Sequence, residues 1–112
     1  MTDEHKRRLA DNENLFREVN ERVQEQADGH GTDGHRYAYF CECSRPDCME
    51  RVQLTTAEYE LIRADGARFI LVAGHQIDEI ESVVLRLDES VIVEKQGVAG
   101  ERAETLDPRA AT

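Results

Sequence analysis

The first regular pattern in the chain is a helical one, over residues 3–27. Thr2 can cap this helix, the two acidic residues after it suit the positive end of the helix dipole, and Asp28-Gly29 ends it. We therefore expect residues 1–28 to form an amphipathic helix that packs on the protein's own sheet, or meets a protein partner or a second copy of the chain. Its apolar side chains recur at i, i+3 and i+4 and form a narrow stripe, Leu9, Leu15, Phe16, Val19, Val23 and Ala27.

After a glycine-rich linker, residues 29–35, the pattern changes to short runs of β-branched and aromatic residues. A short helix should follow the first two of these strands, with Thr55 and Glu58 as its capping box and Asp65-Gly66 at its end. The chain beyond residue 96 has almost no large apolar side chain, so 96–112 is expected to be a mobile tail with a weak helix near residues 101–105. Strands are expected at 36–41, 49–54, 68–72, 82–87 and 91–95.

Together these elements predict an α+β fold in which residues 36–95 form a small antiparallel sheet with one short helix. At 112 residues and 12.8 kDa the chain has room for one domain. Its aromatic core is small, because it has three Tyr, three Phe and no Trp. A core of that size gains stability from a bound metal, since metal-binding energy is then also folding energy.

All three cysteines lie within eight positions, as Cys41, Cys43 and Cys48. In this C-x-C-x4-C spacing the first two side chains share a face of a strand, and the turn at 44–47 can bring Cys48 back to them. Three thiolates and one neutral imidazole form the tetrahedral shell of structural zinc, so we predict a Zn²⁺ site at the tip of the first hairpin, a zinc knuckle. The alternatives are a redox pair among these cysteines, or three reduced cysteines packed as small apolar residues.

The fourth ligand is expected to be His75, which follows an apolar run and a glycine and so stands at the end of a strand. His30 and His35 lie in the linker and could reach a metal at an entropic cost, whereas His5 belongs to the charged N-terminus. The assignment of His75 depends on the strand at 68–72 pairing with the first hairpin, because that pairing would bring the histidine to the cysteines.

The charge of the chain bears on its partners. With 24 acidic and 14 basic residues the net charge is −10, which argues against direct binding to nucleic acid and against docking on anionic lipid. No stretch approaches the roughly 18 apolar residues that a membrane span requires. The N-terminal residues lack the apolar segment of a secretory signal, so we expect a cytoplasmic protein.

One combination of segments extends over most of the chain: residues 14–22, Phe40-Cys41-Glu42-Cys43 with Cys48, Glu58-Tyr59 with Arg63, Phe69, Gly74-His75 and Val93-Glu94-Lys95. Taken together, these segments resemble a group of small, uncharacterised bacterial proteins. The resemblance implies a shared architecture without a mechanism. It also implies that Cys41, Cys43, Cys48 and His75 act together.

These features favour a non-enzymatic, zinc-stabilised protein-interaction module of a regulatory kind. The alternative is a thiol-based redox sensor that releases zinc on oxidation, with Glu42 and the nearby Arg36, Arg45 and Arg51 tuning the thiolates. A zinc enzyme, with Glu42 as acid or base, is a third hypothesis and would need an open coordination position. The chain lacks a phosphate loop, a Ser–His–Asp pattern and an H-E-x-x-H helix.

Overall fold

The computed structural model describes residues 2–28 and 34–109, so most of the predicted linker, residues 29–33, lies outside the described residues. The α+β class is confirmed, with a long N-terminal helix, short helices and small antiparallel sheets. In chain order the elements are α1 (Asp3–Asp28), β1 (Arg36–Phe40), β2 (Arg51–Thr55), α2 (Thr56–Arg63), β3 (Arg68–Val72), β4 (Glu81–Arg86), β5 (Ser90–Lys95) and α3 (Gly97–Leu106).

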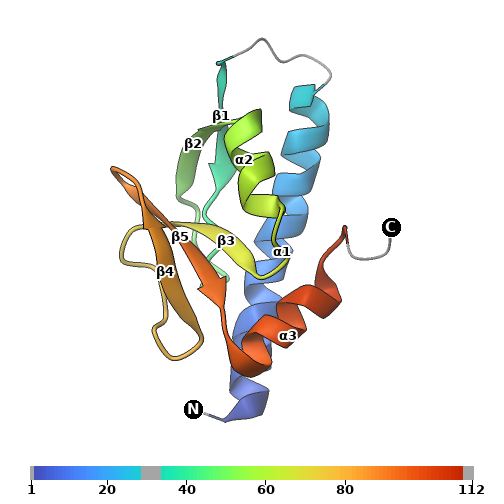
Figure 1. Cartoon of the computed structure of the whole chain (residues 1–112), viewed down its shortest axis with the longest axis vertical. Coiled ribbons are helices and arrows are strands. Elements are labelled where there is room, and N and C mark those ends of the chain that lie inside the picture. The colour runs from blue at the N-terminus through green and yellow to red at the C-terminus, as the bar shows by residue number, and fades with distance from the viewer. Residues whose placement is uncertain (1, 29–33, 110–112) are drawn as a thin grey trace.

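The described strands form two antiparallel sheets where the sequence predicted one. β1 pairs with β2, and a separate sheet has the order β3-β5-β4. α1 runs along the length of the molecule, with α2 beside its C-terminal half and α3 beside its N-terminal half (Figure 1). α1 therefore spans both sheets and contacts β1, α2 and α3.

Alternation along β3 gives the molecule two apolar clusters. Phe69 and Leu71 point to one face and pack with the cysteines and with Val91 and Val93 of β5. Ile70 points to the other face and packs with the β1–β2 hairpin and with Tyr59 and Ile62 of α2. Side chains at i and i+2 of a strand share a face, so both faces of β3 are buried.

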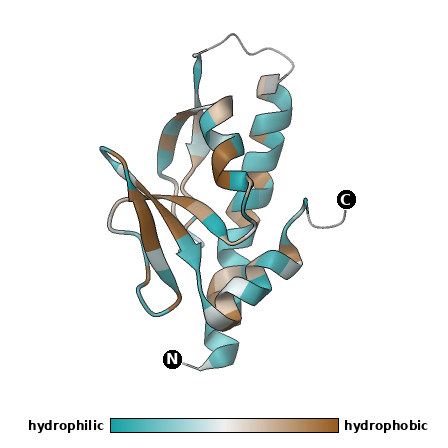
Figure 2. Ribbon diagram, viewed as in Figure 1, coloured by the Kyte–Doolittle hydropathy of each residue, from teal (hydrophilic) through white to brown (hydrophobic). Residues whose placement is uncertain are grey.

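The face that α1 buries is largely polar, which differs from the predicted apolar stripe. Of that stripe, Ala27 is buried, whereas Leu15 and Val19 are 61% and 42% exposed. Figure 2 shows how little of α1 is hydrophobic compared with β4 and β5. The buried positions still follow helical spacing, and they are Ala10, Glu13, Asn14, Arg17, Asn20, Gln24 and Ala27.

Of these polar side chains, Asn14 bonds Glu18 and Arg17 within α1, and the others find a partner on another segment of the chain. Arg17 donates hydrogen bonds to the carbonyl oxygens of Gly66 and Ala103 and lies 4.3 Å from the centre of the Phe69 ring. Asn20 binds both the N–H and the C=O of Phe40. Satisfied in this way, a buried polar group avoids the large cost of lost hydration.

The prediction of a mobile tail is wrong for residues 97–106, which form α3. This helix packs against α1 through small side chains, and Ala99, Gly100 and Ala103 are buried. A Cβ atom at Gly100 would lie 2.8 Å from the carbonyl oxygen of Lys95, so the absence of a side chain permits this close approach. The sequence indicated only a weak helix near residues 101–105, because the residues that α3 buries are small.

Three buried charges lie where β4 and β5 meet α1. The ammonium of Lys95 hydrogen-bonds the carboxylates of both Glu13 and Glu81, and all three side chains are fully buried. Burial raises the pKa of Glu13 from 4.5 to about 7, against the opposing effect of Lys95. Between pH 4.5 and about 7, the folded chain therefore keeps a proton at Glu13 that the unfolded chain has largely lost.

This shift predicts how stability depends on pH. A carboxyl group whose pKa is higher in the folded state contributes stability that is full below pH 4.5 and is lost as the pH rises through about 7. In urea titrations between these two values, the unfolding free energy of the wild type should fall relative to that of Glu13→Gln, by at most about 1.4 kcal/mol per pH unit. Glu25→Gln, on the exposed face of α1, should run parallel to the wild type. If the unfolding free energies of Glu13→Gln and the wild type changed with pH in parallel, the raised pKa of Glu13 would be contradicted.

Candidate metal centre

The first hairpin positions two sulfurs side by side. Beyond β1, the N–H of Cys41 bonds the carbonyl of Glu50, and the N–H of Glu42 bonds the carbonyl of Ile70, at 3.0 and 2.8 Å. The chain stays extended there, so Cys41 and Cys43 share a face and the side chain between them points away. A turn closed by the bond from the N–H of Cys48 to the carbonyl of Arg45, 3.1 Å long, then returns the third cysteine to the other two.

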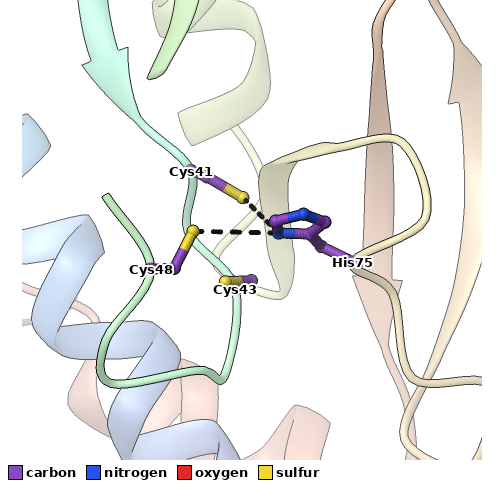
Figure 3. Close-up of side chains that lie close together, drawn as sticks. All are labelled: Cys41, Cys43, Cys48 and His75. Atoms are coloured by element: carbon purple, nitrogen blue, oxygen red, sulfur yellow. Dashed lines mark hydrogen bonds between the residues drawn. The ribbon is translucent and has the colours of Figure 1, made fainter. Parts of the chain in front are cut away.

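His75 arrives from the loop after β3. Gly74 has a φ of +94°, which a residue with a side chain rarely adopts, and the N–H of His75 bonds the carbonyl of Val72 at 3.1 Å. This tight turn points the imidazole at the sulfurs of Cys41 and Cys48 (Figure 3). The distances from Nδ1 to these two sulfurs are 3.5 and 3.7 Å.

The structure thus brings together all four residues that the sequence singled out. One ligand atom from each of Cys41, Cys43, Cys48 and His75 lies within 4.8 Å of all the others, and the three cysteines are buried. In a tetrahedron with zinc–ligand bonds of about 2.3 Å to sulfur and 2.0–2.1 Å to nitrogen, the S···N edge is about 3.6 Å and the S···S edge about 3.8 Å. The two S···N distances match that edge, so the cluster can hold a metal ion.

The route that brings His75 to the cysteines differs from the prediction. β3 belongs to the sheet of β5 and β4 and does not pair with the hairpin as a strand of one sheet. It meets the segment after β1 through two sets of hydrogen bonds: Glu42 and Ile70 are joined through the Glu42 N–H and the Glu42 side chain, and the Val72 N–H donates to the Cys41 sulfur. These contacts are enough to place the end of β3 next to the cysteines.

Hydrogen bonds inside the cluster favour one thiolate. The pKa of Cys43 is lowered to about 5, chiefly because the Cys41 thiol hydrogen-bonds its sulfur, with further help from the backbone of Arg45 and from His75. The same bond raises the pKa of Cys41, and burial raises that of Cys48. The N–H of Val72 also donates to the Cys41 sulfur, at 3.2 Å. Binding of a divalent cation would displace the remaining thiol protons.

Glu50 orients the histidine, and sequence reasoning missed this role. Its carboxylate lies 2.8 Å from Nε2 of His75. A proton on Nε2 leaves the lone pair of Nδ1 facing the sulfurs, which is the arrangement that carboxylates give to metal-binding histidines. The sequence placed Glu50 in a strand beside Val52 and Leu54, and its separation of two residues from Cys48 is the only local sign of a link to the site.

Removal of this carboxylate should weaken metal binding. We expect Glu50→Ala to lower the metal affinity about 10- to 100-fold, because the imidazole loses the partner that fixes its ring and tautomer. Asp47→Ala is the matched control, since Asp47 is an exposed carboxylate of the same loop. Competition with a chelator of known affinity measures both variants, and equal affinities for Glu50→Ala and the wild type would rule out the orienting role.

The other candidates from the sequence lie elsewhere. The carboxylate of Glu42 is fully buried and accepts hydrogen bonds from Asn20, from the Tyr59 hydroxyl and from the N–H of Ile70. It links α1, α2 and β3, and the four residues of the cluster do not include it. His35 is exposed and contacts the ring of Tyr37.

The remaining histidines and arginines are also accounted for. His5 is exposed in the first turn of α1, and His30 lies outside the described residues. Arg51 stacks over Phe40, and Arg36 binds the carbonyl of Gln53. Arg45 is exposed and contributes to the cluster through its backbone.

Comparison with known proteins gave no relative: no family model, curated protein or solved structure matched the chain. The resemblance to small bacterial proteins stays a prediction. Of the helices in the described part of the chain, none has both the length and the apolar character needed to cross a membrane.

Proposed function

We propose that the chain is a zinc-stabilised protein-interaction module without catalytic activity. The observation that carries this proposal is the donor set: three sulfurs and one imidazole nitrogen lie within 4.8 Å of one another, and the histidine has a carboxylate partner. Sulfur and imidazole donors in a tetrahedron are the preferred ligands of zinc, and four protein donors leave no position open.

The position of the cluster supports a structural role. Its ligands come from three separate places, the end of β1, the following turn and the loop after β3, so one ion would tie the hairpin to the second sheet. The sulfurs also form part of an apolar cluster with Phe69, Leu71, Val91 and Val93. In a chain of this size the hydrophobic core alone gives limited stability, and a metal ion that links the hairpin to the second sheet would add to it.

Two features favour this role over the alternatives. A redox-sensing cysteine is both acidic and accessible, whereas the acidic Cys43 is 0% exposed and Cys48 only 8% exposed. A zinc enzyme needs a free acid or base beside the metal, whereas the carboxylate of Glu42 is held by Asn20 and Tyr59 and that of Glu50 by His75.

Metal content tests the zinc assignment. Elemental mass spectrometry on the wild type, purified with reductant and without chelator, should find one zinc per chain. Cys43→Ser and His75→Ala should lose most of it, while His35→Ala, the matched histidine control, should keep it. A wild type without metal would refute the proposal, and a different stoichiometric metal would refute the choice of zinc.

A further inference from the structure

The sheet of β3, β5 and β4 is covered on one face and only half covered on the other. Ile70, Ile92 and Leu85 lie opposite one another across the three strands and share the second face. α2 and the first hairpin cover Ile70, which is fully buried. Leu85 on β4 is 51% exposed, so within the described residues the cover ends before the edge of the sheet.

The uncovered half forms an apolar groove beside α2. It has a volume of about 430 Å³. Val84 and Leu87, which line it, are 40% and 39% exposed, although side chains of this type are usually buried. Figure 2 shows the hydrophobic colour continuing along β4 and β5 at this edge of the molecule. Its apolar lining consists of Leu54, Leu61, Ile62, Val84, Leu85, Leu87 and Ile92.

The exposed face of α2 borders this groove and carries a protruding leucine. Ala57, Leu61 and Ala64 are exposed at i, i+4 and i+7, so they form one apolar stripe. Leu61, at 76%, is the most exposed large apolar side chain of the described residues, and it stands between two small ones. The exposed side chain of Leu61 and the apolar groove therefore lie on the same surface of the molecule.

We propose that this surface binds a second copy of the chain about a two-fold axis, with Leu61 of each copy seated in the groove of the other. A two-fold contact requires one surface that is complementary to itself, and a protrusion beside a matching groove meets that requirement. It would also cover the open half of each sheet with a helix, which is the usual way to bury such a face.

The charges around the groove fit the same partner. Glu58 of α2 and Arg68 both line the groove, and Arg86 lines the cavity adjoining it. The other acidic residue of α2, Glu60, is ion-paired with Arg109. Two copies with a net charge of −10 each repel one another in general, so a stable contact needs a surface with both signs. Here Glu58 of one copy can meet Arg68 of the other, because both residues line the same groove.

This inference deepens the proposed function and rests on it, because it names the partner of the interaction module and moves the contact from α1 to α2 and β4. Sedimentation velocity of the zinc-loaded full chain is the test. The wild type should be a dimer, and Leu61→Glu and Leu85→Glu should each raise the dissociation constant about 30-fold or more, since each places a charge at the centre of the contact. Leu15→Glu is the matched control: Leu15 is 61% exposed on α1, and the dimer should persist.

The outcomes separate this inference from the proposed function when zinc is measured in the same samples. A zinc-loaded wild type that stays monomeric would overturn the two-fold contact. A dimer that survives both groove variants, or that is lost in Leu15→Glu, would also overturn it. A dimer without zinc would leave the contact in place and refute the zinc module.

Discussion

Removal of the proposed zinc ion is expected to lower the midpoint of thermal unfolding of this chain by roughly 15–30 °C. A ligand held by the folded state alone stabilises that state by about 4 kcal/mol when its free concentration is 1,000 times the dissociation constant. In a small domain each kcal/mol moves the midpoint by roughly 4–8 °C. The metal-free chain also has to keep three sulfurs and an imidazole together with no ion between them.

Circular dichroism measures this effect on the zinc-loaded chain, on the chain treated with chelator and reductant, and on the same sample after zinc is restored. Cys43→Ser is the control, because a chain that has lost a ligand should show little difference between the loaded and treated samples. If the zinc-loaded and the metal-free wild type unfolded at the same midpoint temperature, metal binding at the cluster would not stabilise the fold.

Replacement of Lys95 by methionine should destabilise the chain by about 3–5 kcal/mol, because it leaves buried carboxylates without their cation. Lys95 is the cation that the carboxylates of Glu13 and Glu81 share, and all three side chains are fully buried. Its ammonium also lies 4.8 Å from the centre of the Phe69 ring. Methionine has a similar length and fills the same space, so the loss of charge should dominate over any cavity.

Urea unfolding at neutral pH measures the effect of this change. Lys6→Met, at the only other lysine of the chain, should change the unfolding free energy by less than about 0.5 kcal/mol. Neutralisation of the partners in Lys95→Met/Glu13→Gln/Glu81→Gln should recover part of the loss, since an uncharged trio no longer buries unpaired charge. A Lys95→Met chain as stable as the wild type would show that these carboxylates have no need of the cation.

Much of the local structure could be predicted from short stretches of sequence. α1 was expected at 3–27 and is observed at Asp3–Asp28, and β3 has the expected bounds. The capping box at the start of α2 is confirmed, with hydrogen bonds between Thr55 and Glu58 in both directions. In each case a few neighbouring residues carry all the information, because spacing and capping depend on the backbone geometry of one turn or one strand.

The candidate metal centre could be predicted only in part from local sequence. The spacing of Cys41, Cys43 and Cys48 predicted that their sulfurs would meet, because two share a strand face and a turn returns the third. The choice of His75 came from its place at a strand end, but the assumed strand pairing was wrong. Glu50 could not be assigned, because its contact with the His75 ring joins residues that are 25 positions apart in the chain.

The tertiary structure decided which face of α1 is buried and where the chain after residue 96 lies. An apolar pattern marks a buried face when hydrophobic transfer drives the packing. Here α1 buries Arg17 and Glu13, and their burial is stable only because Ala103 and Lys95, more than 80 positions away, supply the hydrogen bonds and the opposite charge. Polar burial depends on partners that no local pattern specifies. The sequence alone therefore determined α1, α2, the strands and the cysteine spacing, and the fold determined α3 and how the elements pack.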